Sequence, residues 1–390
     1  MASAYILLSC KPNSQDGLRI ALVVPYFSTD ITTGEFWSSR ELMNLGHKVE
    51  IFTTNRSPPR GGSIKQLTEP IVKVLRTAGD VGDNPIPIEI KRLRDEFDLI
   101  WIQEDYPLFC FTMRFLNKSV PSVLTTERYY YPPSPLKSLA LRLLDCTSSR
   151  MLRESSTALT AHSNASRRFV LSLGVDPSRV TTIFQGVDTK LFTPGHSEYL
   201  HEVFDISKSK RILLNVGRLH PYKGQRRLIA AFKMISKRIP DLELVIWGRG
   251  AEAKTLVRFA QSLDVQDRVH IGAQSLLKGD QVASLYNSST ICIFPSIYEP
   301  FGMSALEAQS CGRPIIVSNT GGLCDIVEDR LTGLIVKSGG TNGLASSILQ
   351  LFDMNIHKMG EDARLRAENL FDWNRIALQY SNLFRRCVTR

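Results

Sequence analysis

Several features that mark common classes of protein are missing from this 390-residue chain. Its seven cysteines are scattered and form no Cys-x-x-Cys pair, which argues against a zinc cluster and a disulfide framework and indicates a reducing, cytoplasmic compartment. No apolar run reaches the roughly 18 residues that a membrane-spanning helix needs. Residues 1–16 lack the basic start and long apolar core of a signal peptide, so we expect a loose extension there.

The net charge is +10, yet the sequence contains no basic arm and no long run of adjacent lysines and arginines. We therefore expect no nucleic acid partner, and favour phosphorylated small molecules or an anionic membrane surface. Two basic groups follow predicted strands in the first half of the chain, each with a single acidic residue. They are Arg56, Arg60, Lys65, Lys73 and Arg76 with Glu69, and Arg128, Lys137, Arg142, Arg150 and Arg153 with Asp145. Either both groups open toward a cleft and meet an anionic acceptor, or they are solvated surface.

Short apolar segments alternate with segments of helical period along the chain. Such alternation, with near-continuous apolar strands, indicates α/β domains with parallel sheets covered on both faces. We predict two doubly wound Rossmann-like domains, residues 1–195 and 196–371, which face each other across a cleft. An amphipathic helix at 372–390 is predicted to pack across both domains or to return to the first. The predicted strands lie at 19–25, 48–54, 98–103, 122–127, 157–163 and 180–186, then at 211–217, 242–248, 269–273, 291–296, 314–318 and 333–336.

Two acidic residues, Glu299 and Glu307, flank a glycine turn between the predicted strand 291–296 and a helix that begins near Met303. Gly302 lets the backbone approach a ligand, and the start of the helix offers free N–H groups to an anion. Carboxylate oxygens accept hydrogen bonds from neighbouring hydroxyls, such as those of a sugar or a ribose. The pattern predicts that one acid reaches the reacting group and the other reaches a different part of the same ligand.

The segment "NVGRLHPYKG", residues 215–224, also follows a predicted strand. Arg218 presents a planar fork to phosphate oxygens and Lys223 presents a point charge. Together they could neutralise a diphosphate leaving group without a metal. The sequence has no Asp-x-Asp motif and no histidine cluster with metal spacing at a strand end, so we predict neither a metal nor a cofactor.

These motifs resemble those of glycosyltransferase family 4, whose members are retaining enzymes of the GT-B fold. "GRLHPYKG" is similar to the family's G-R-L-x-x-x-K-G, and "EPFGMSALEA" is similar to its E-x7-E signature. "IFQGVDTKLFTP" resembles the segment that closes the family's first domain. The resemblance extends from about Arg19 to the end of the chain, and its most specific motifs lie in the C-terminal half.

The resemblance implies a retaining enzyme that moves a sugar from a nucleotide-diphosphate donor to an acceptor hydroxyl, usually without a metal. Arg218 and Lys223 would hold the donor diphosphate, Glu299 would contact the transferred sugar, and Glu307 would contact the ribose. The acceptor is expected to be a glycan or a lipid-linked or anionic molecule, met in the cytoplasm or at the inner face of the membrane. The remaining donor-side residues are Gly217 and, through their backbone N–H groups, Phe301, Gly302 and Met303.

The first half of the chain departs from the family pattern. Members usually carry a glycine pair after the first strand, where this chain has only Gly34. Many carry a histidine after the strand equivalent to 122–127, where this chain has Glu127, followed by Arg128. Gly34, Glu127 and Arg128 are the candidate acceptor-side residues. The alternatives are a phosphorylase or sugar-nucleotide epimerase on the same fold, or a non-catalytic partner that binds the donor.

Other polar and apolar patterns are interpreted as structural. His162 and His220 are assigned to the framework, and the Gly-x-Gly of "WGRGAEA" lacks the third glycine of a dinucleotide site. A stripe of apolar residues at helical spacing is interpreted as packed core and not as a membrane anchor. Its members are Leu136, Leu139, Ala140, Leu143 and Leu144.

Overall fold

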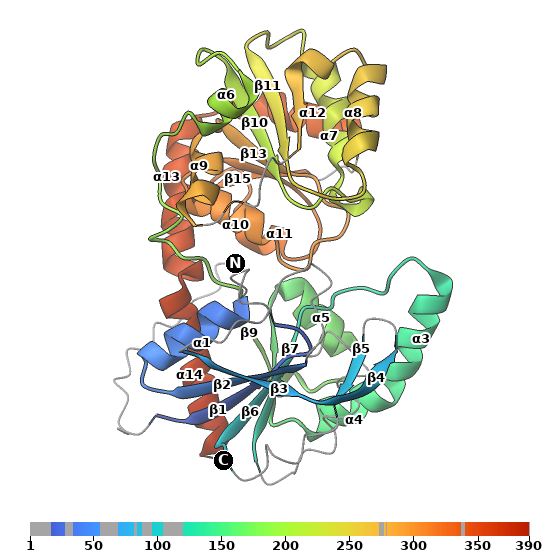
Figure 1. Cartoon of the computed structure of the whole chain (residues 1–390), viewed down its shortest axis with the longest axis vertical. Helices are drawn as coiled ribbons and strands as arrows, with labels where there is room; N and C mark the ends of the chain where they lie inside the picture. Colours follow the sequence, from blue (N-terminus) through green and yellow to red (C-terminus); the bar gives the residue numbers. More distant parts are fainter. Residues whose placement is uncertain are drawn as a thin grey trace.

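The computed structural model describes residues 17–27, 34–54, 69–81, 84–87, 96–103, 120–272, 277, 279–336 and 340–389. Two parallel sheets form two domains that follow one another along the longest axis of the molecule (Figure 1). This confirms the predicted α/β class with two doubly wound domains. Within the described residues, no helix is both long and apolar enough to cross a membrane.

The first domain is built on a seven-stranded sheet in the order β3-β2-β1-β6-β7-β8-β9. Successive residues of β1 face opposite sides, so Ile20 and Leu22 join one core while Ala21 and Val23 join the other. The strands are β1 (Arg19–Val23), β2 (Lys48–Thr54), β3 (Ile71–Leu75), β6 (Leu99–Gln103), β7 (Ser122–Thr126), β8 (Ala158–Ala161) and β9 (Val180–Thr182). The helices are α1 (Gly34–Asn44), α3 (Pro135–Cys146), α4 (Ser148–Ser155) and α5 (Asn164–Ser172).

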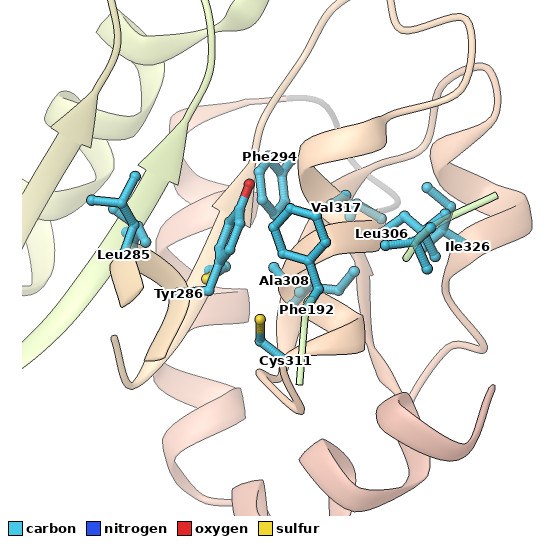
Figure 2. Close-up of a cluster of buried hydrophobic side chains, with 14 of the residues drawn as sticks. Phe192, Leu285, Tyr286, Phe294, Leu306, Ala308, Cys311, Val317 and Ile326 are labelled. Atoms are coloured by element: carbon cyan, nitrogen blue, oxygen red, sulfur yellow. The ribbon is translucent and has the colours of Figure 1, made fainter. Parts of the chain in front are cut away.

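The second domain has a six-stranded sheet in the order β12-β11-β10-β13-β14-β15. Its strands are β10 (Arg211–Val216), β11 (Leu242–Trp247), β12 (Val269–Ile271), β13 (Ile291–Phe294), β14 (Ile315–Ser318) and β15 (Gly333–Val336). One face packs on α7 (Gln225–Ile235), α8 (Ala253–Ser262) and α12 (Thr341–Phe352). The other packs on α6 (Tyr199–Phe204), α9 (Asp280–Asn287), α10 (Met303–Ser310) and α11 (Leu323–Ile326), around the buried cluster in Figure 2.

The C-terminal segment joins the two domains. Helix α13 (Ile356–Arg366) packs on α10 of the second domain, and a π-helical turn at Ala367–Phe371 leads into α14 (Trp373–Val388). Helix α14 then packs on α1 and β6 of the first domain (Figure 1). The crossing therefore takes place at the π turn, and α14 itself covers the first sheet. At the crossing, a Cβ on Gly186 would lie 2.4 Å from the Trp373 ring, so only glycine fits there.

Three strands at or beside the edge of the first domain were not predicted from the sequence. Edge strand β3 has a largely exposed pattern, with Ile71 50% and Val74 47% exposed. The other two are β4 (Thr77–Val81) and β5 (Asn84–Pro87), which form a separate antiparallel pair. The sequences of β3, β4 and β5, IVKVL, TAGDV and NPIP, lack the continuous apolar runs by which the other strands are recognised.

The prediction that the leucine stripe on α3 is packed core was wrong. Leu136, Leu139 and Leu143 are 79%, 56% and 60% exposed, and Asp145 is the buried residue of this helix. Helix α3 packs on α4 and lies at the outer flank of the first domain (Figure 1). The helical period showed that one face is apolar, but it did not show whether that face meets protein or solvent.

A buried ion-pair cluster around Asp145 attaches α3 to the domain. Arg128 donates to both carboxylate oxygens, at 2.9 and 2.8 Å, and Arg153 donates to Oδ1 at 3.1 Å. The Tyr131 hydroxyl donates to Oδ2 at 2.8 Å. Burial raises the pKa of Asp145, but the hydrogen bonds and the charge of its partners outweigh burial, so the pKa lies below its ordinary value. Two residues of the second basic group, Arg128 and Arg153, are therefore engaged inside the domain.

We expect Asp145→Ala to lower the free energy of unfolding by about 3–5 kcal/mol, because Arg153, 2% exposed, then loses the carboxylate that balances its buried charge. Urea unfolding at neutral pH measures this loss. The matched control is Glu154→Ala, which removes the partner of Arg150 in an exposed i,i+4 pair. That change should cost no more than about 0.5 kcal/mol. Equal losses in the two variants would contradict the structural role of Asp145.

Candidate functional site

Four side chains predicted to act on one ligand lie at or near the carboxyl edge of the second sheet. Arg218 and Lys223 follow β10, Glu299 follows β13, and Glu307 lies in α10. Strands β10 and β13 are parallel neighbours, so the loops that follow them emerge side by side. Ligands of open parallel sheets bind in this position.

Lys223 and Glu299 form a direct ion pair, although 76 residues separate them. The Lys223 ammonium donates to Glu299 Oε2 at 2.5 Å, and the two side chains are 19% and 14% exposed. Ser296 Oγ donates to the same carboxylate oxygen at 2.9 Å. Lys223 ends a single 3-10 turn at Pro221–Lys223, which directs the lysine toward the neighbouring loop. Ser296, which the sequence reasoning missed, thus helps to orient Glu299.

The turn before α10 requires glycine. Gly302 has a φ of 112°, and a Cβ there would lie 2.5 Å from the Leu323 side chain. Gly302 also occupies the N-cap position of α10, so no side chain covers the first N–H groups of this helix. Phe301 is 3% exposed in the core, which leaves its backbone rather than its ring for a ligand, and Met303 begins the helix.

Glu307 has a buried partner that the sequence reasoning also missed. The Tyr286 hydroxyl donates to Glu307 Oε2 at 2.6 Å. The Tyr286 ring stands in the apolar cluster of the second domain, with Phe192 and Phe294 beside it (Figure 2). Burial raises the pKa of Glu307 to about 7, while the hydrogen bond from Tyr286 acts in the opposite direction. Glu307 therefore changes its charge close to neutral pH.

Arg218 and Gly217 lie on the loop immediately after β10. The Arg218 side chain is exposed, with its guanidinium 5.7 Å from the centre of the Tyr222 ring. The backbone N–H of Gly217 donates to the Trp247 carbonyl at 3.0 Å, which continues the pairing of β10 with β11. The Lys223 ammonium also lies 5.7 Å from the centre of the Tyr222 ring, so Arg218 is accessible near the partly buried Lys223–Glu299 pair.

Two of the three acceptor-side candidates meet through Gln185. Its side-chain amide donates to Glu127 Oε1 at 2.7 Å, and a Cβ on Gly34 would lie 2.4 Å from its amide oxygen. The buried His162 ring contacts the Ile183 carbonyl through Nδ1, and its Nε2 lies 3.9 Å from Glu127 Oε1. The structure brings Gly34 and Glu127 together in this way, whereas Arg128 binds Asp145.

The loop after β7 links the first domain to the Glu299 loop. The backbone N–H of Glu299 donates to the Tyr129 hydroxyl at 2.6 Å, and the Tyr130 ring stacks on Tyr298 at 4.5 Å with a 10° interplanar angle. Burial raises the pKa of Tyr129 to about 12. Beside this contact lies a cavity of about 440 Å³ whose lining comes from both domains and includes Tyr129, Arg168 and Thr320.

Two family models match the chain, one in each domain. The model described as "Glycosyltransferase Family 4" matches residues 38–191, and the one described as "Glycosyl transferases group 1" matches residues 197–368. Together they span most of the chain and meet between the two sheets. The chain belongs to glycosyltransferase family 4.

Curated relatives of this family 4 chain match it over about half of their length. N-acetyl-α-D-glucosaminyl L-malate synthase of Bacillus anthracis is 30% identical over 213 residues, which are 54% of this chain and 55% of the relative. D-inositol 3-phosphate glycosyltransferase of Mycolicibacterium smegmatis is 32% identical over 184 residues, 46% of this chain and 41% of the relative. The chain thus spans about half the length of the curated relatives it matches.

Solved structures resemble the family 4 chain over almost its whole length. Sucrose-phosphate synthase from Thermosynechococcus elongatus has a TM-score of 0.76 at 23% identity, with 95% of this chain and 99% of the other covered. Anabaena HepE in complex with UDP has a TM-score of 0.78 at 18% identity, with 95% and 100% covered. These similarities confirm the predicted GT-B fold.

The predicted donor-side residues stand in spaced motifs, but the partners that the structure gives them could not be predicted. Lys223 and Glu299 stand in "GRLHPYKG" and "EPFGMSALEA", whereas Ser296 and Tyr286 lie outside the quoted motifs, and Gln185 lies in "IFQGVDTKLFTP" without any sign of its contact with Glu127. Across the part of the chain that the structure describes, no three His, Cys, Asp or Glu side chains gather as a metal site would need.

The raised pKa of Glu307 predicts a pH-dependent stability. The protonated form is favoured in the folded chain, so stability should fall as the pH rises from the ordinary value of 4.5 through about 7. A shift of this size corresponds to at most roughly 3 kcal/mol. We expect Glu307→Gln, which cannot ionise, to gain stability relative to the wild type between pH 5 and about pH 8. Urea unfolding across this range checks it, with the exposed Glu361→Gln as control. A difference between wild type and Glu307→Gln that does not change with pH would exclude this titration.

Proposed function

We propose that the protein is a retaining, nucleotide-sugar-dependent glycosyltransferase that transfers a sugar to an acceptor hydroxyl. The observation that carries this proposal is the Lys223–Glu299 pair, 2.5 Å apart and beside Arg218 at the carboxyl edge of the second sheet. A cation for a diphosphate and a carboxylate for sugar hydroxyls stand next to each other there. HepE, which shares the fold, has been solved with UDP and with UDP-glucose, and this supports a nucleotide-sugar donor.

The donor diphosphate would change the partner of Lys223. In the structure Lys223 is neutralised by Glu299. A bound diphosphate, together with Arg218, would draw the ammonium away and leave Glu299 to accept hydrogen bonds from the sugar. Ser296, which donates to the Glu299 carboxylate, would continue to hold it during this exchange. Charge that builds up on the leaving diphosphate is then met by fixed cations, so the transfer requires no metal or cofactor.

The ribose of the donor would lie against Glu307, whose orientation is set by Tyr286. Backbone N–H groups at Phe301, Gly302 and Met303 would face the phosphate and the sugar, since the start of α10 has no capping side chain. The assignment of Gly217 to the donor side rests on its place beside Arg218.

The acceptor would enter from the first domain, where Gly34, Gln185 and Glu127 lie together. The names of two relatives mention L-malate and inositol 3-phosphate, which are anionic, and this supports an anionic acceptor. The predicted basic surface is smaller than expected. Arg56, Arg60 and Lys65 lie outside the described residues, Lys73 pairs with Glu50, and Arg128 and Arg153 bind Asp145. We assign the acceptor contact at the inner face of a membrane to the basic residues that remain on the surface of α3 and α4.

Incubation of the purified protein with a nucleotide sugar alone, followed by analysis of the products, separates the alternatives. A non-catalytic binding partner would leave the nucleotide sugar intact, and an epimerase would change the sugar while it stays on the nucleotide. A phosphorylase would react only when inorganic phosphate is added, whereas we expect a transferase to hydrolyse its donor slowly without acceptor. The anomeric configuration of the transferred sugar, read by NMR, tests retention.

The donor-site assignment predicts different effects for three variants. Arg218→Ala and Lys223→Ala should each weaken binding of the donor and slow transfer by roughly 10²-fold, because each removes charge from the leaving group. Glu299→Gln should lower turnover but leave the affinity for the nucleoside diphosphate unchanged or higher, because Lys223 loses its competing partner. Titration calorimetry and initial rates measure these effects, with the nucleotide sugar chosen by a thermal-shift screen. An equal loss of nucleoside-diphosphate affinity in all three variants would refute the role of Glu299.

Because Arg218 and Lys223 supply the positive charge, activity should persist in excess EDTA. The measurement is the rate of donor consumption before and after chelation, followed by addition of Mn²⁺ or Mg²⁺. Loss of activity with EDTA that Mn²⁺ restores would show that the side chains of Arg218 and Lys223 are not sufficient to neutralise the leaving diphosphate.

A further inference from the structure

Helix α3 presents its apolar side to solvent. Leu136, Leu139 and Leu143 share one face of the helix, since their spacing of three and four residues follows the helical period. They are 79%, 56% and 60% exposed. Helix α4, which packs against α3, adds Met151 at 51% exposure. Exposed leucines occur singly on most proteins, but three along one face of a 12-residue helix form a surface.

The one fully buried residue of the same helix is charged, while Ser138, Leu141 and Leu144 are half-buried, so the helix departs from the usual arrangement of a surface helix. Asp145 is buried and holds α3 to the domain through Arg128, Arg153 and Tyr131. A surface helix normally turns its charges outward and its leucines inward. Here the charged cluster attaches the helix and leaves the leucines outside. Hydrophobic packing on the described part of this domain therefore does not account for them.

The charges around the leucines are mostly positive. Lys137 and Arg142 are exposed on α3, and Arg150 is exposed on α4, against the exposed acid Glu154. The Arg142 guanidinium lies 4.0 Å from the centre of the Tyr131 ring, at the edge of the helix between the leucine face and Asp145. The single acid of α3, Asp145, is buried and paired. The exposed side of α3 is thus apolar and basic, which is the composition that suits the boundary between head groups and acyl chains of an anionic bilayer.

We propose that α3 is the surface on which the protein lies against an anionic lipid bilayer. Leu136, Leu139 and Leu143 enter the head-group boundary, and Lys137 and Arg142 meet lipid phosphates. Figure 1 shows α3 on the outer flank of the first domain, where a flat surface can reach it. This inference gives a location to the membrane contact in the proposed function, and it does not depend on sugar transfer.

The chain connects this surface directly to the candidate site. Tyr129, whose hydroxyl binds the Glu299 backbone, lies six residues before Pro135, the first residue of α3. The intervening loop carries Tyr130 and Tyr131, which contact Tyr298 and Asp145 respectively. An acceptor held in the membrane at α3 would therefore need only a short path to the Glu299 loop.

Co-sedimentation with lipid vesicles tests the proposal. We expect the full chain to bind vesicles of phosphatidylcholine with phosphatidylglycerol, and to bind about tenfold more weakly to phosphatidylcholine alone or at high salt. The double variant Leu136→Ser, Leu143→Ser should reduce binding to the anionic vesicles by about tenfold or more. The matched control is Leu365→Ser, Leu378→Ser, which changes two leucines of 52% and 49% exposure on α13 and α14. This control should bind like the wild type.

Two results would overturn the proposal. One is equal vesicle binding by the wild type and the α3 variant, and the other is no binding by the wild type. The wild type could also fail to bind vesicles but self-associate, with the self-association lost in the α3 variant. That outcome would show that the leucine face of α3 contacts a second copy of the chain and not a membrane. Because the leucines are exposed, the α3 variant should keep the wild-type melting temperature and hydrolyse a soluble nucleotide sugar at the wild-type rate. Vesicle binding without any donor hydrolysis would refute the proposed enzyme and leave the membrane surface intact.

Discussion

In an all-parallel sheet every strand ends at the same edge, and the candidate site of this protein depends on that constraint. Lys223 and Glu299 are far apart in the sequence but follow neighbouring strands, β10 and β13. Because of this constraint the two loops emerge side by side, and the Lys223 ammonium lies 2.5 Å from Glu299 Oε2. Only local turns are then needed to direct the two side chains toward each other. A 3-10 turn does so for Lys223, and the positive φ of Gly302 does so for the start of α10 beside Glu299.

The position of the Glu299 loop also depends on the other domain. Tyr129 accepts the backbone N–H of Glu299, and Tyr130 stacks on Tyr298. A second contact lies nearby, where the Asp325 carboxylate of α11 accepts from the backbone and side chain of Asn164 at the start of α5. A relative movement of the domains would therefore remove two partners of the loop that carries Glu299. The acid proposed to contact the sugar is thus fully held only when the first domain lies against its loop.

The sequence predicted the elements whose apolar pattern is set by burial on both faces. Strand β10 reads RILLNV because its alternate residues enter two different cores. Edge strand β3 lacked such a pattern, with Ile71 and Val74 exposed. Contacts between distant polar residues were out of reach for a different reason. The hydrogen bond from Gln185 to Glu127 joins loops 58 residues apart, and neither residue carries a pattern that marks its partner.

Helix α3 marks the limit of periodicity as a guide. Its apolar stripe was visible in the sequence, but a period of 3.6 residues identifies a face and not the medium which that face meets. The orientation of α3 is set by Asp145, because its carboxylate on the opposite face is buried in ion pairs with Arg128 and Arg153. The sequence places these arginines in the segments before and after α3, and nothing in that pattern distinguishes a buried, paired aspartate from a solvated one.

The charges of the candidate site would affect the affinity for an intact nucleotide sugar and the affinity for a nucleoside diphosphate differently. In the structure Lys223 and Glu299 neutralise each other at low exposure, and Glu307, with a pKa of about 7, is partly protonated at neutral pH. A nucleoside diphosphate that attracts Lys223 would leave the Glu299 carboxylate without its cation in a partly buried position, which is costly. Under the proposed roles, a complete nucleotide sugar would offset that cost, because its sugar hydroxyls would donate to Glu299 while its phosphates would accept from Lys223. With the proposed roles of Lys223 and Glu299, the ion pair would disfavour the product nucleotide relative to the intact donor, and the diphosphate product would be released once the sugar has left.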